Sequence, residues 1–159
     1  MALRYYFDLV CPYSYILGFE VERTEDDGLA EIEWSPFELR PAPKELPEPR
    51  GTYIRDHWRD HVYGLAATHR AFFVEGLNLA DEGVLREAAQ EAGLDSDEAI
   101  VAAWDPERIS GLRAMREEAK SIGVHGVPTV ATAGRVLYYG AASPGKTRAL
   151  LTDNKEIAS

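Results

Sequence analysis

The order of apolar and polar positions along the 159-residue chain predicts short strands near both ends and helices between them. Residues 3–10 (LRYYFDLV) combine aromatic and β-branched side chains and predict a buried strand. A helix is expected to begin at Pro12, because the missing N–H of proline costs nothing at a first helical position, and to end near Gly28. Residues 30–35 alternate apolar with polar side chains and predict a second strand, parallel to the first because a helix connects the two.

The middle of the chain has helical spacing over most of residues 52–122. Four prolines between residues 41 and 49 come before it and exclude regular helix there. Asp81 and Asp95 stand where N-terminal capping residues are expected. This part of the chain is therefore predicted to be a block of several helices.

The last part of the chain returns to short strands. Residues 128–132 and 136–140 lie on either side of a Gly-Arg turn and predict a hairpin, and a short helix is expected from about residue 143 to residue 151. The whole pattern predicts an α/β protein with the order β-α-β, helical block, β-β-α.

The composition narrows the classes of partner. The chain has 17 Lys and Arg against 27 Asp and Glu, a net charge of −10, and no basic run, so we expect no nucleic acid partner. Charged residues interrupt every apolar stretch, so no membrane span is expected. A single cysteine and an N-terminus without the pattern of a secretory signal predict a cytoplasmic protein.

That cysteine, Cys11, lies between the first predicted strand and the helix that Pro12 begins. The free N–H groups and the positive end of the helix dipole favour the thiolate there, so a partly exposed Cys11 is a candidate nucleophile. Ser14 could donate its hydroxyl hydrogen to the sulfur, and Tyr13 could shape access to it. A buried, inert cysteine that packs as a small hydrophobic residue is the alternative, and the sequence leaves both open.

One pair of histidines and one single histidine are candidates for metal binding or proton transfer. His57 and His61 have a spacing that puts both on one helix face and could chelate a metal ion, but no third ligand is evident, so we expect a solvated or cleft-lining face and no metal site. His125, three residues before Pro128, could support the thiolate or carry a proton, and packing within its loop is the alternative.

Two segments carry a more specific pattern: RYYFDLVCPYSYILGFEVERT at residues 4–24, and Gly-Val-His-Gly-Val-Pro-Thr at residues 123–129. They resemble the DsbA-like thioredoxin-fold superfamily, in particular the branch with 2-hydroxychromene-2-carboxylate isomerases, kappa-class glutathione transferases and cytoplasmic DsbA-type oxidoreductases. Residues 139–141 (YGA) resemble the Gly-Ala element that follows in this superfamily.

The resemblance implies a thioredoxin-like framework at residues 1–36 and 123–159 with a helical insertion at residues 37–122, all in one compact unit. It also implies a cis Val127–Pro128 peptide bond beside Cys11, with the Val127 backbone free to pair with a bound peptide or glutathione. A trans proline that opens an edge strand is the alternative. Pro12, Tyr13 and His125 would join Val127 and Pro128 around the substrate.

One departure from the superfamily decides the expected chemistry. Dithiol oxidoreductases carry Cys-x-x-Cys and the isomerase and transferase branch carries Ser-Pro-Tyr-Ser, whereas residues 11–14 here read Cys-Pro-Tyr-Ser. Because Ser14 cannot resolve a mixed disulfide on Cys11, an external thiol must do so. We therefore expect a monothiol oxidoreductase with glutathione or protein thiols and disulfides as partners and no tightly bound cofactor.

Two other functions stay open at this point. One is a glutathione-dependent transferase or isomerase, in which Ser14 or Cys11 stabilises the glutathione thiolate. The other is a thioredoxin-fold binding protein without turnover. Related transferases form dimers, and exposed aromatic residues of the helical block could make a homodimer here as well.

Overall fold

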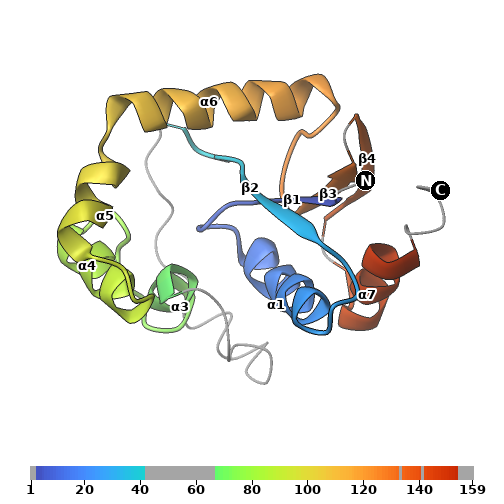
Figure 1. The fold of residues 1–159 in the computed structure, drawn as a ribbon, viewed down its shortest axis with the longest axis horizontal. Helices are drawn as coiled ribbons and strands as arrows, with labels where there is room; N and C mark the ends of the chain where they lie inside the picture. Colours follow the sequence, from blue (N-terminus) through green and yellow to red (C-terminus); the bar gives the residue numbers. More distant parts are fainter. Residues whose placement is uncertain (1–2, 42–66, 133, 141, 154–159) are drawn as a thin grey trace.

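The computed structural model describes residues 3–41, 67–132, 134–140 and 142–153 (Figure 1). The elements are β1 (Leu3–Phe7), α1 (Pro12–Asp26), β2 (Ile32–Pro36), α3 (Ala67–Phe73), α4 (Glu82–Glu91), α5 (Ser96–Ala103), α6 (Pro106–Ser121), β3 (Thr129–Thr132), β4 (Arg135–Tyr139) and α7 (Pro144–Asp153). This order confirms the predicted β-α-β unit, the helical block from residue 67 onward and the β-β-α unit, whereas the part of the block predicted over residues 52–66 lies outside the described residues.

The four strands form one mixed sheet in the order β2-β1-β3-β4. β1 and β2 run parallel, with Tyr5 opposite Trp34, as expected for two strands joined by a helix. β3 is antiparallel to both β1 and β4, and a register shift between Val130 and Ala131 interrupts its pairing with β4. The predicted parallel pair and the predicted hairpin are both present.

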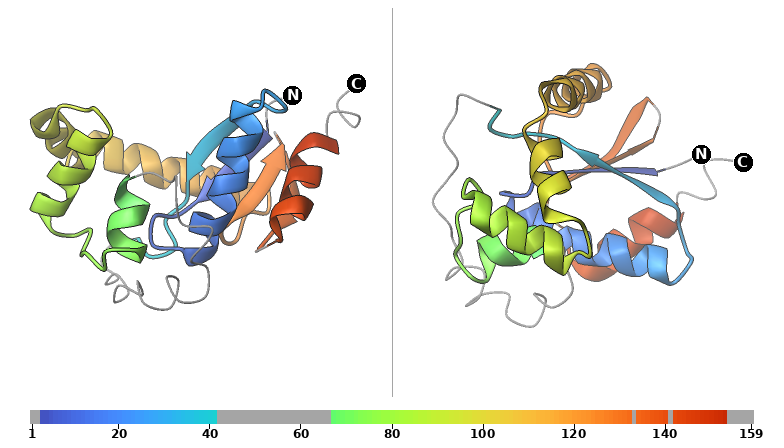
Figure 2. Two further views of the ribbon diagram at one scale, coloured as in Figure 1. Left: turned by 90° about the horizontal axis from the view of Figure 1, so that it is seen from below. Right: turned by 60° about the vertical axis from the view of Figure 1, so that its left-hand side comes forward.

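Helices cover both faces of this sheet: α1 and α7 lie on one side and α6 on the other (Figures 1 and 2). The alternation of side chains along β1 explains the two layers. Tyr5 belongs to a hydrophobic cluster with Leu17 of α1 and Leu151 of α7, whereas the next residue, Tyr6, belongs to a cluster with Ala119 of α6.

The remaining helices, α3 to α5, lie beyond the end of β1 (Figure 1). A third cluster joins them to the framework, because Tyr15 of α1 packs there with Phe72 and Phe73 of α3. The two predicted caps are confirmed: the Asp81 carboxylate accepts a hydrogen bond at the start of α4, and that of Asp95 accepts two at the start of α5. Within the described ranges, no helix is long and apolar enough to cross a bilayer.

The first strand is shorter than the predicted one, because β1 ends at Phe7 rather than at Val10. The Asp8 carboxylate accepts a hydrogen bond from the Val10 N–H (3.1 Å), and the Asp8 carbonyl accepts one from the Cys11 N–H (3.1 Å). These two bonds form a turn that leads the chain out of the sheet and into α1.

Candidate functional site

Cys11 occupies the N-cap position of α1. Its backbone is extended (φ −92°, ψ 114°), Pro12 follows at the start of the helix, and the Cys11 carbonyl accepts the first helical hydrogen bond from the Tyr15 N–H (3.0 Å). No side chain caps this helix, and its first turn holds no acidic residue. The Cys11 side chain therefore lies at the positive end of the helix dipole, without a carboxylate in that turn to oppose a thiolate.

The Cys11 sulfur contacts the loop that leads into β3. Its Sγ donates a hydrogen bond to the Val127 carbonyl oxygen (3.6 Å), and the peptide bond between Val127 and Pro128 is cis. Thr129 fixes this loop, because its hydroxyl donates a hydrogen bond to the Gly126 carbonyl (2.7 Å). The structure therefore brings Cys11 together with Val127 and Pro128, although Cys11 and Val127 are 116 residues apart in the chain.

The predicted exposure of the cysteine is wrong. Only 4% of Cys11 is exposed, because the residue belongs to a hydrophobic cluster with Tyr6, Phe37, Ala119, Val124, Val127 and Ala131. Most of these side chains come from segments far away in sequence, so no local pattern around Cys11 could have revealed the burial. In this conformation the thiol is packed as a small hydrophobic group that also makes one hydrogen bond.

The tight approach of Tyr139 explains the glycine at position 126. A Cβ atom on Gly126 would come within 2.8 Å of the Tyr139 ring, closer than real Cβ contacts allow. The Tyr139 side chain covers the Gly126 backbone while 62% of the residue stays exposed. Tyr139 therefore forms an outer wall of the loop that contacts the cysteine.

Ser14 is placed differently from its predicted role. The residue is fully buried, and its Oγ accepts a hydrogen bond from the Asp8 N–H (3.4 Å) instead of donating to the Cys11 sulfur. The physical reason is the direction of helical side chains, which lean toward the helix N-terminus and so bring Ser14 over the preceding turn. Tyr5 strengthens the same region by donating its hydroxyl hydrogen to the Ser14 carbonyl (2.7 Å).

The other predicted site residues lie at the surface. Tyr13 is 49% exposed, Pro12 is half-buried and His125 is exposed. His57 and His61, the pair considered for a metal ion, lie outside the described residues. No group of three or more potential ligands gathers around a metal position in the parts of the chain that the structure describes.

Asp8 is a site residue that the sequence analysis missed. One carboxylate oxygen accepts the Val10 N–H (3.1 Å) and the other accepts the Leu39 N–H (2.7 Å), so Asp8 joins the turn before Cys11 to the segment after β2. Burial raises the pKa of this carboxyl, and the hydrogen bonds from Leu39 and Val10 oppose that rise. An ionisable residue within the apolar run of residues 3–10 was the signal that could have identified it.

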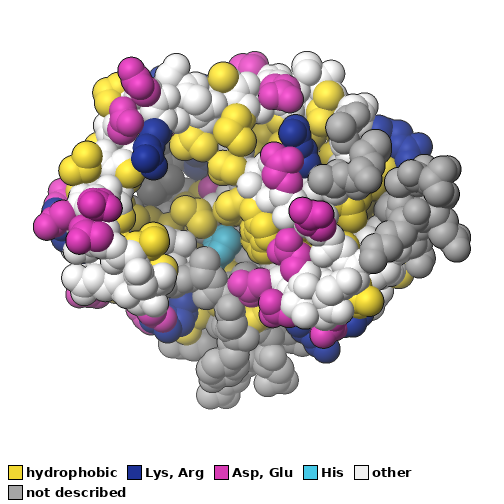
Figure 3. Space-filling model, in the orientation of Figure 1, with side chains coloured by type: hydrophobic (Ala, Val, Ile, Leu, Met, Phe, Trp, Pro, Cys, Tyr) yellow, Lys and Arg dark blue, Asp and Glu magenta, His cyan; other side chains and the backbone are white. Residues whose placement is uncertain are grey.

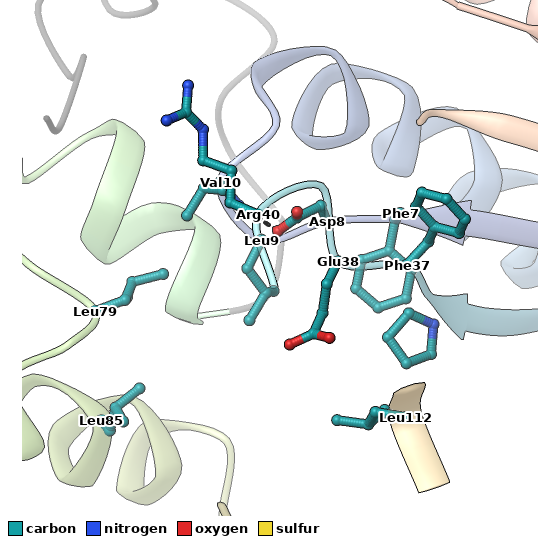
Figure 4. Close-up of a pocket in the computed structure, with 11 residues that line it drawn as sticks. Phe7, Asp8, Leu9, Val10, Phe37, Glu38, Arg40, Leu79, Leu85 and Leu112 are labelled. Carbon is teal, nitrogen blue, oxygen red and sulfur yellow. Dashed lines mark hydrogen bonds between the residues drawn. The ribbon is translucent and has the colours of Figure 1, made fainter. Parts of the chain in front are cut away.

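A pocket of about 390 Å³ lies beside these residues. Its apolar wall includes Phe7, Leu9, Phe37, Leu79, Leu85 and Leu112, and its polar residues are Asp8, Glu38 and Arg40 (Figure 4). The face drawn in Figure 3 is hollowed below α6, and hydrophobic side chains gather around the hollow. Cys11 itself does not line the pocket, but its chain neighbour Val10 does, and Phe37 both lines the pocket and belongs to the cluster around Cys11.

Comparisons with known proteins agree with this geometry at the level of the fold. The 2-hydroxychromene-2-carboxylate isomerase structure is 14% identical, with 99% of this chain and 95% of that chain covered and a TM-score of 0.69. The cytosolic disulfide reductase DsbM from Pseudomonas aeruginosa, in a structure with GSH, is 17% identical, with 98% of this chain and 100% of that chain covered and a TM-score of 0.70. These similarities show that the chain has the predicted thioredoxin-like α/β fold.

Two sequence comparisons add to this result. The uncharacterized protein YwbO from Bacillus subtilis (strain 168) is 23% identical, and the match covers 58% of this chain and 66% of the relative, just under two thirds of its length. The family model described as "DSBA-like thioredoxin domain" matches residues 59–151, which is more than half of the chain. The chain therefore belongs to the family of DSBA-like thioredoxin domains.

Proposed function

We propose that this chain is a monothiol oxidoreductase that exchanges disulfides through Cys11 and uses glutathione as the external resolving thiol. The observation that carries the proposal is the position of the Cys11 sulfur, at the start of α1 and 3.6 Å from the Val127 carbonyl oxygen. The thiolate is the form that attacks a disulfide, so the Cys11 thiol must lose the proton that it donates to the Val127 carbonyl oxygen.

The reaction takes two balanced steps. The Cys11 thiolate attacks the glutathione sulfur of a glutathionylated protein, a new bond forms between Cys11 and glutathione, and the protein leaves as a thiolate. A second glutathione, as its thiolate, then attacks the sulfur of the bound glutathione. This step releases oxidised glutathione and regenerates the Cys11 thiolate. Ser14 has no thiol, so the chain itself cannot complete the second step.

The choice of glutathione has one further support. The disulfide reductase DsbM, which shares the fold of this chain, is known in a structure with GSH. The low exposure of Cys11 adds a requirement, because side chains around the sulfur must move before a disulfide can reach it. Tyr13 and Tyr139 are exposed close to the two segments that meet at Cys11. We therefore expect mutation of either tyrosine to change the rate at which a disulfide reaches the Cys11 sulfur, but not the exchange reaction itself.

The pocket beside Cys11 favours a second candidate function. A transferase or isomerase that uses glutathione needs space for another substrate next to the thiol, and this pocket of about 390 Å³ offers it. The buried sulfur favours the third alternative, a binding protein without turnover. The experiment below separates the three.

The test begins with oxidised glutathione and intact-mass measurement of the folded chain. We expect one glutathione on Cys11, removal of the adduct by reduced glutathione, and turnover of a glutathionylated peptide. The matched control is the same chain unfolded in urea, which keeps the cysteine but loses the helix N-terminus.

An adduct that forms no faster in the folded chain than in the unfolded control, together with no turnover, would support the binding protein. Turnover of an aromatic electrophile with glutathione that survives Cys11→Ser would support the transferase or isomerase. Either result would overturn the monothiol proposal.

A further inference from the structure

The pocket beside Cys11 contains a carboxylate with one oxygen that no group in the described ranges of the chain binds. Glu38 extends into the space between Leu85 and Leu112 (Figure 4). Its Oε2 atom is buried and has no hydrogen bond partner among the described residues. Burial of a carboxylate oxygen without a hydrogen bond donor costs free energy, because no protein donor replaces the hydrogen bonds that the oxygen makes to water when it is exposed. Such an atom in an apolar pocket can accept a hydrogen bond from a ligand that enters the pocket.

Two described arginines lie near Glu38, and both are directed away from its carboxylate. Arg116 of α6 uses its Nε to bind the Glu38 backbone carbonyl (2.8 Å) and its Nη1 to bind Glu117 (3.1 Å), and its guanidinium lies over the Phe37 ring (5.1 Å). Arg40 lines the pocket, but Figure 4 shows its guanidinium pointing away from the Glu38 carboxylate. Neither arginine neutralises Glu38 in this structure.

The second carboxylate of the pocket is already occupied. Both oxygens of Asp8 accept backbone hydrogen bonds, from Val10 and from Leu39. Among the residues that line the pocket, Glu38 is therefore the carboxylate that is left to bind a ligand. The pocket offers one acceptor with a negative charge inside a wall of leucine and phenylalanine side chains.

We propose that this pocket binds a small molecule with an apolar body and a protonated amine, which donates a hydrogen bond to Glu38 Oε2. The apolar body would pack against Leu79, Leu85 and Leu112, and a volume of about 390 Å³ is within the range of small-molecule sites. A carboxylate head group would meet repulsion from Glu38, whereas a hydroxyl would make an uncharged and weaker hydrogen bond. This binding goes beyond the exchange chemistry and does not require a reactive Cys11.

Three probes with the same apolar body and different head groups test the proposal: phenylbutylamine, phenylbutanol and phenylbutanoate. Each is titrated into the full chain and followed by NMR chemical shifts. We expect the amine to bind about tenfold more tightly than the alcohol, the difference made by one charge-assisted hydrogen bond, and the carboxylate to bind most weakly.

Matched variants show which residue makes the difference. We expect Glu38→Gln to remove the preference for the amine and leave the affinity for the alcohol unchanged. The control Glu31→Gln replaces an exposed glutamate just before the opposite end of β2 and should leave all three affinities unchanged. Leu112→Ala should weaken the amine and the alcohol alike, whereas Leu94→Ala, at a residue that is 60% exposed, should weaken neither.

The outcome is independent of the proposed oxidoreductase function. Cys11→Ser should abolish the glutathione adduct and leave the binding of the amine unchanged. Equal binding of the three probes, no binding of any, or an amine preference that survives Glu38→Gln would overturn the proposal. Tightest binding of the carboxylate would overturn it as well, and would mean that Arg116 or Arg40 moves to neutralise Glu38.

Discussion

At the residue scale, the chemistry of the site depends on which atom stands at position 14. Ser14 is fully buried one turn after Cys11, and its oxygen accepts the Asp8 N–H. A cysteine at this position is nearly isosteric with serine and would create Cys-x-x-Cys at a helix N-terminus, the arrangement that closes an internal disulfide. The difference between a monothiol and a dithiol site is thus one atom.

We predict that Ser14→Cys changes the product formed with oxidised glutathione. The first adduct on Cys11 should be displaced by the new thiol, leaving an internal disulfide and no bound glutathione in the intact mass. Ser121→Cys is the control, because it adds a second thiol at an exposed residue far along the chain and should instead give a chain with two glutathiones. A stable single adduct on Cys11 in Ser14→Cys would contradict the prediction.

Some residue positions could be predicted from the sequence and others could not. The place of Cys11 at the start of a helix could be predicted because Pro12 is a local signal. Its burial could not, because Phe37 and Val127 reach it from distant segments. The role of Ser14 was predicted from spacing alone, and spacing does not say whether a hydroxyl turns toward the sulfur or toward a backbone amide.

At the element scale, capping residues give the clearest link between sequence and structure. The predicted start of α5 was correct because the Asp95 carboxylate accepts the N–H groups of Asp97 (2.9 Å) and Glu98 (3.0 Å). The end of β1 was predicted three residues too late, because residues 8–10 look like a strand but Asp8 binds Val10 and forms a turn. Caps act within one turn and can be predicted, whereas a strand end depends on where pairing stops.

We predict that Asp95→Ala lowers the free energy of unfolding by about 1 kcal/mol, because two N–H groups at the start of α5 lose their acceptor. Urea unfolding followed by circular dichroism measures this change. Asp26→Ala is the matched control at the other end of a helix, α1, where a negative charge faces the negative end of the dipole. Removal of that charge should leave stability unchanged or slightly higher, and an equal loss in both variants would contradict the role of the cap.

At the scale of the whole molecule, the pocket forms where the framework packs against the helical block, and this packing could not be predicted from the sequence alone. The pocket takes its wall from β1, from the segment after β2, from the residue Leu79 before α4, and from α4 and α6. The sequence predicted most of these elements, but not that they would face one another. The acceptor Glu38 has no local pattern that marks it, and only the assembled pocket identifies it.

His69 of α3 is buried between the helical block and the framework. It is 2% exposed, and its ring lies near those of Phe7 in β1 (6.3 Å), Tyr15 in α1 (5.3 Å) and Phe73 in α3 (6.2 Å). Neither ring nitrogen reaches good hydrogen-bond geometry with a described partner, and the nearby Asp8 backbone offsets only part of the effect of burial. Burial therefore lowers the pKa of His69 from 6.5 to about 4.

This shift predicts how stability depends on pH. Between pH 6.5 and about 4 the unfolded chain binds a proton at His69 that the folded protein does not, so stability falls as the pH falls through this window and is unaffected above it. We expect His69 to cost about 2 kcal/mol of unfolding free energy between pH values of about 7 and about 5. His69→Phe keeps an aromatic ring among its neighbours and should remove that loss in urea unfolding at the two pH values.

Asp8 and Glu22, whose pKa values burial raises, change stability with pH in the opposite direction, but they do so in both the parent chain and His69→Phe and therefore cancel in the comparison. His125→Phe, at an exposed histidine, should keep the pH dependence of the parent chain, and the same dependence in His69→Phe would show that His69 is not buried as a neutral ring.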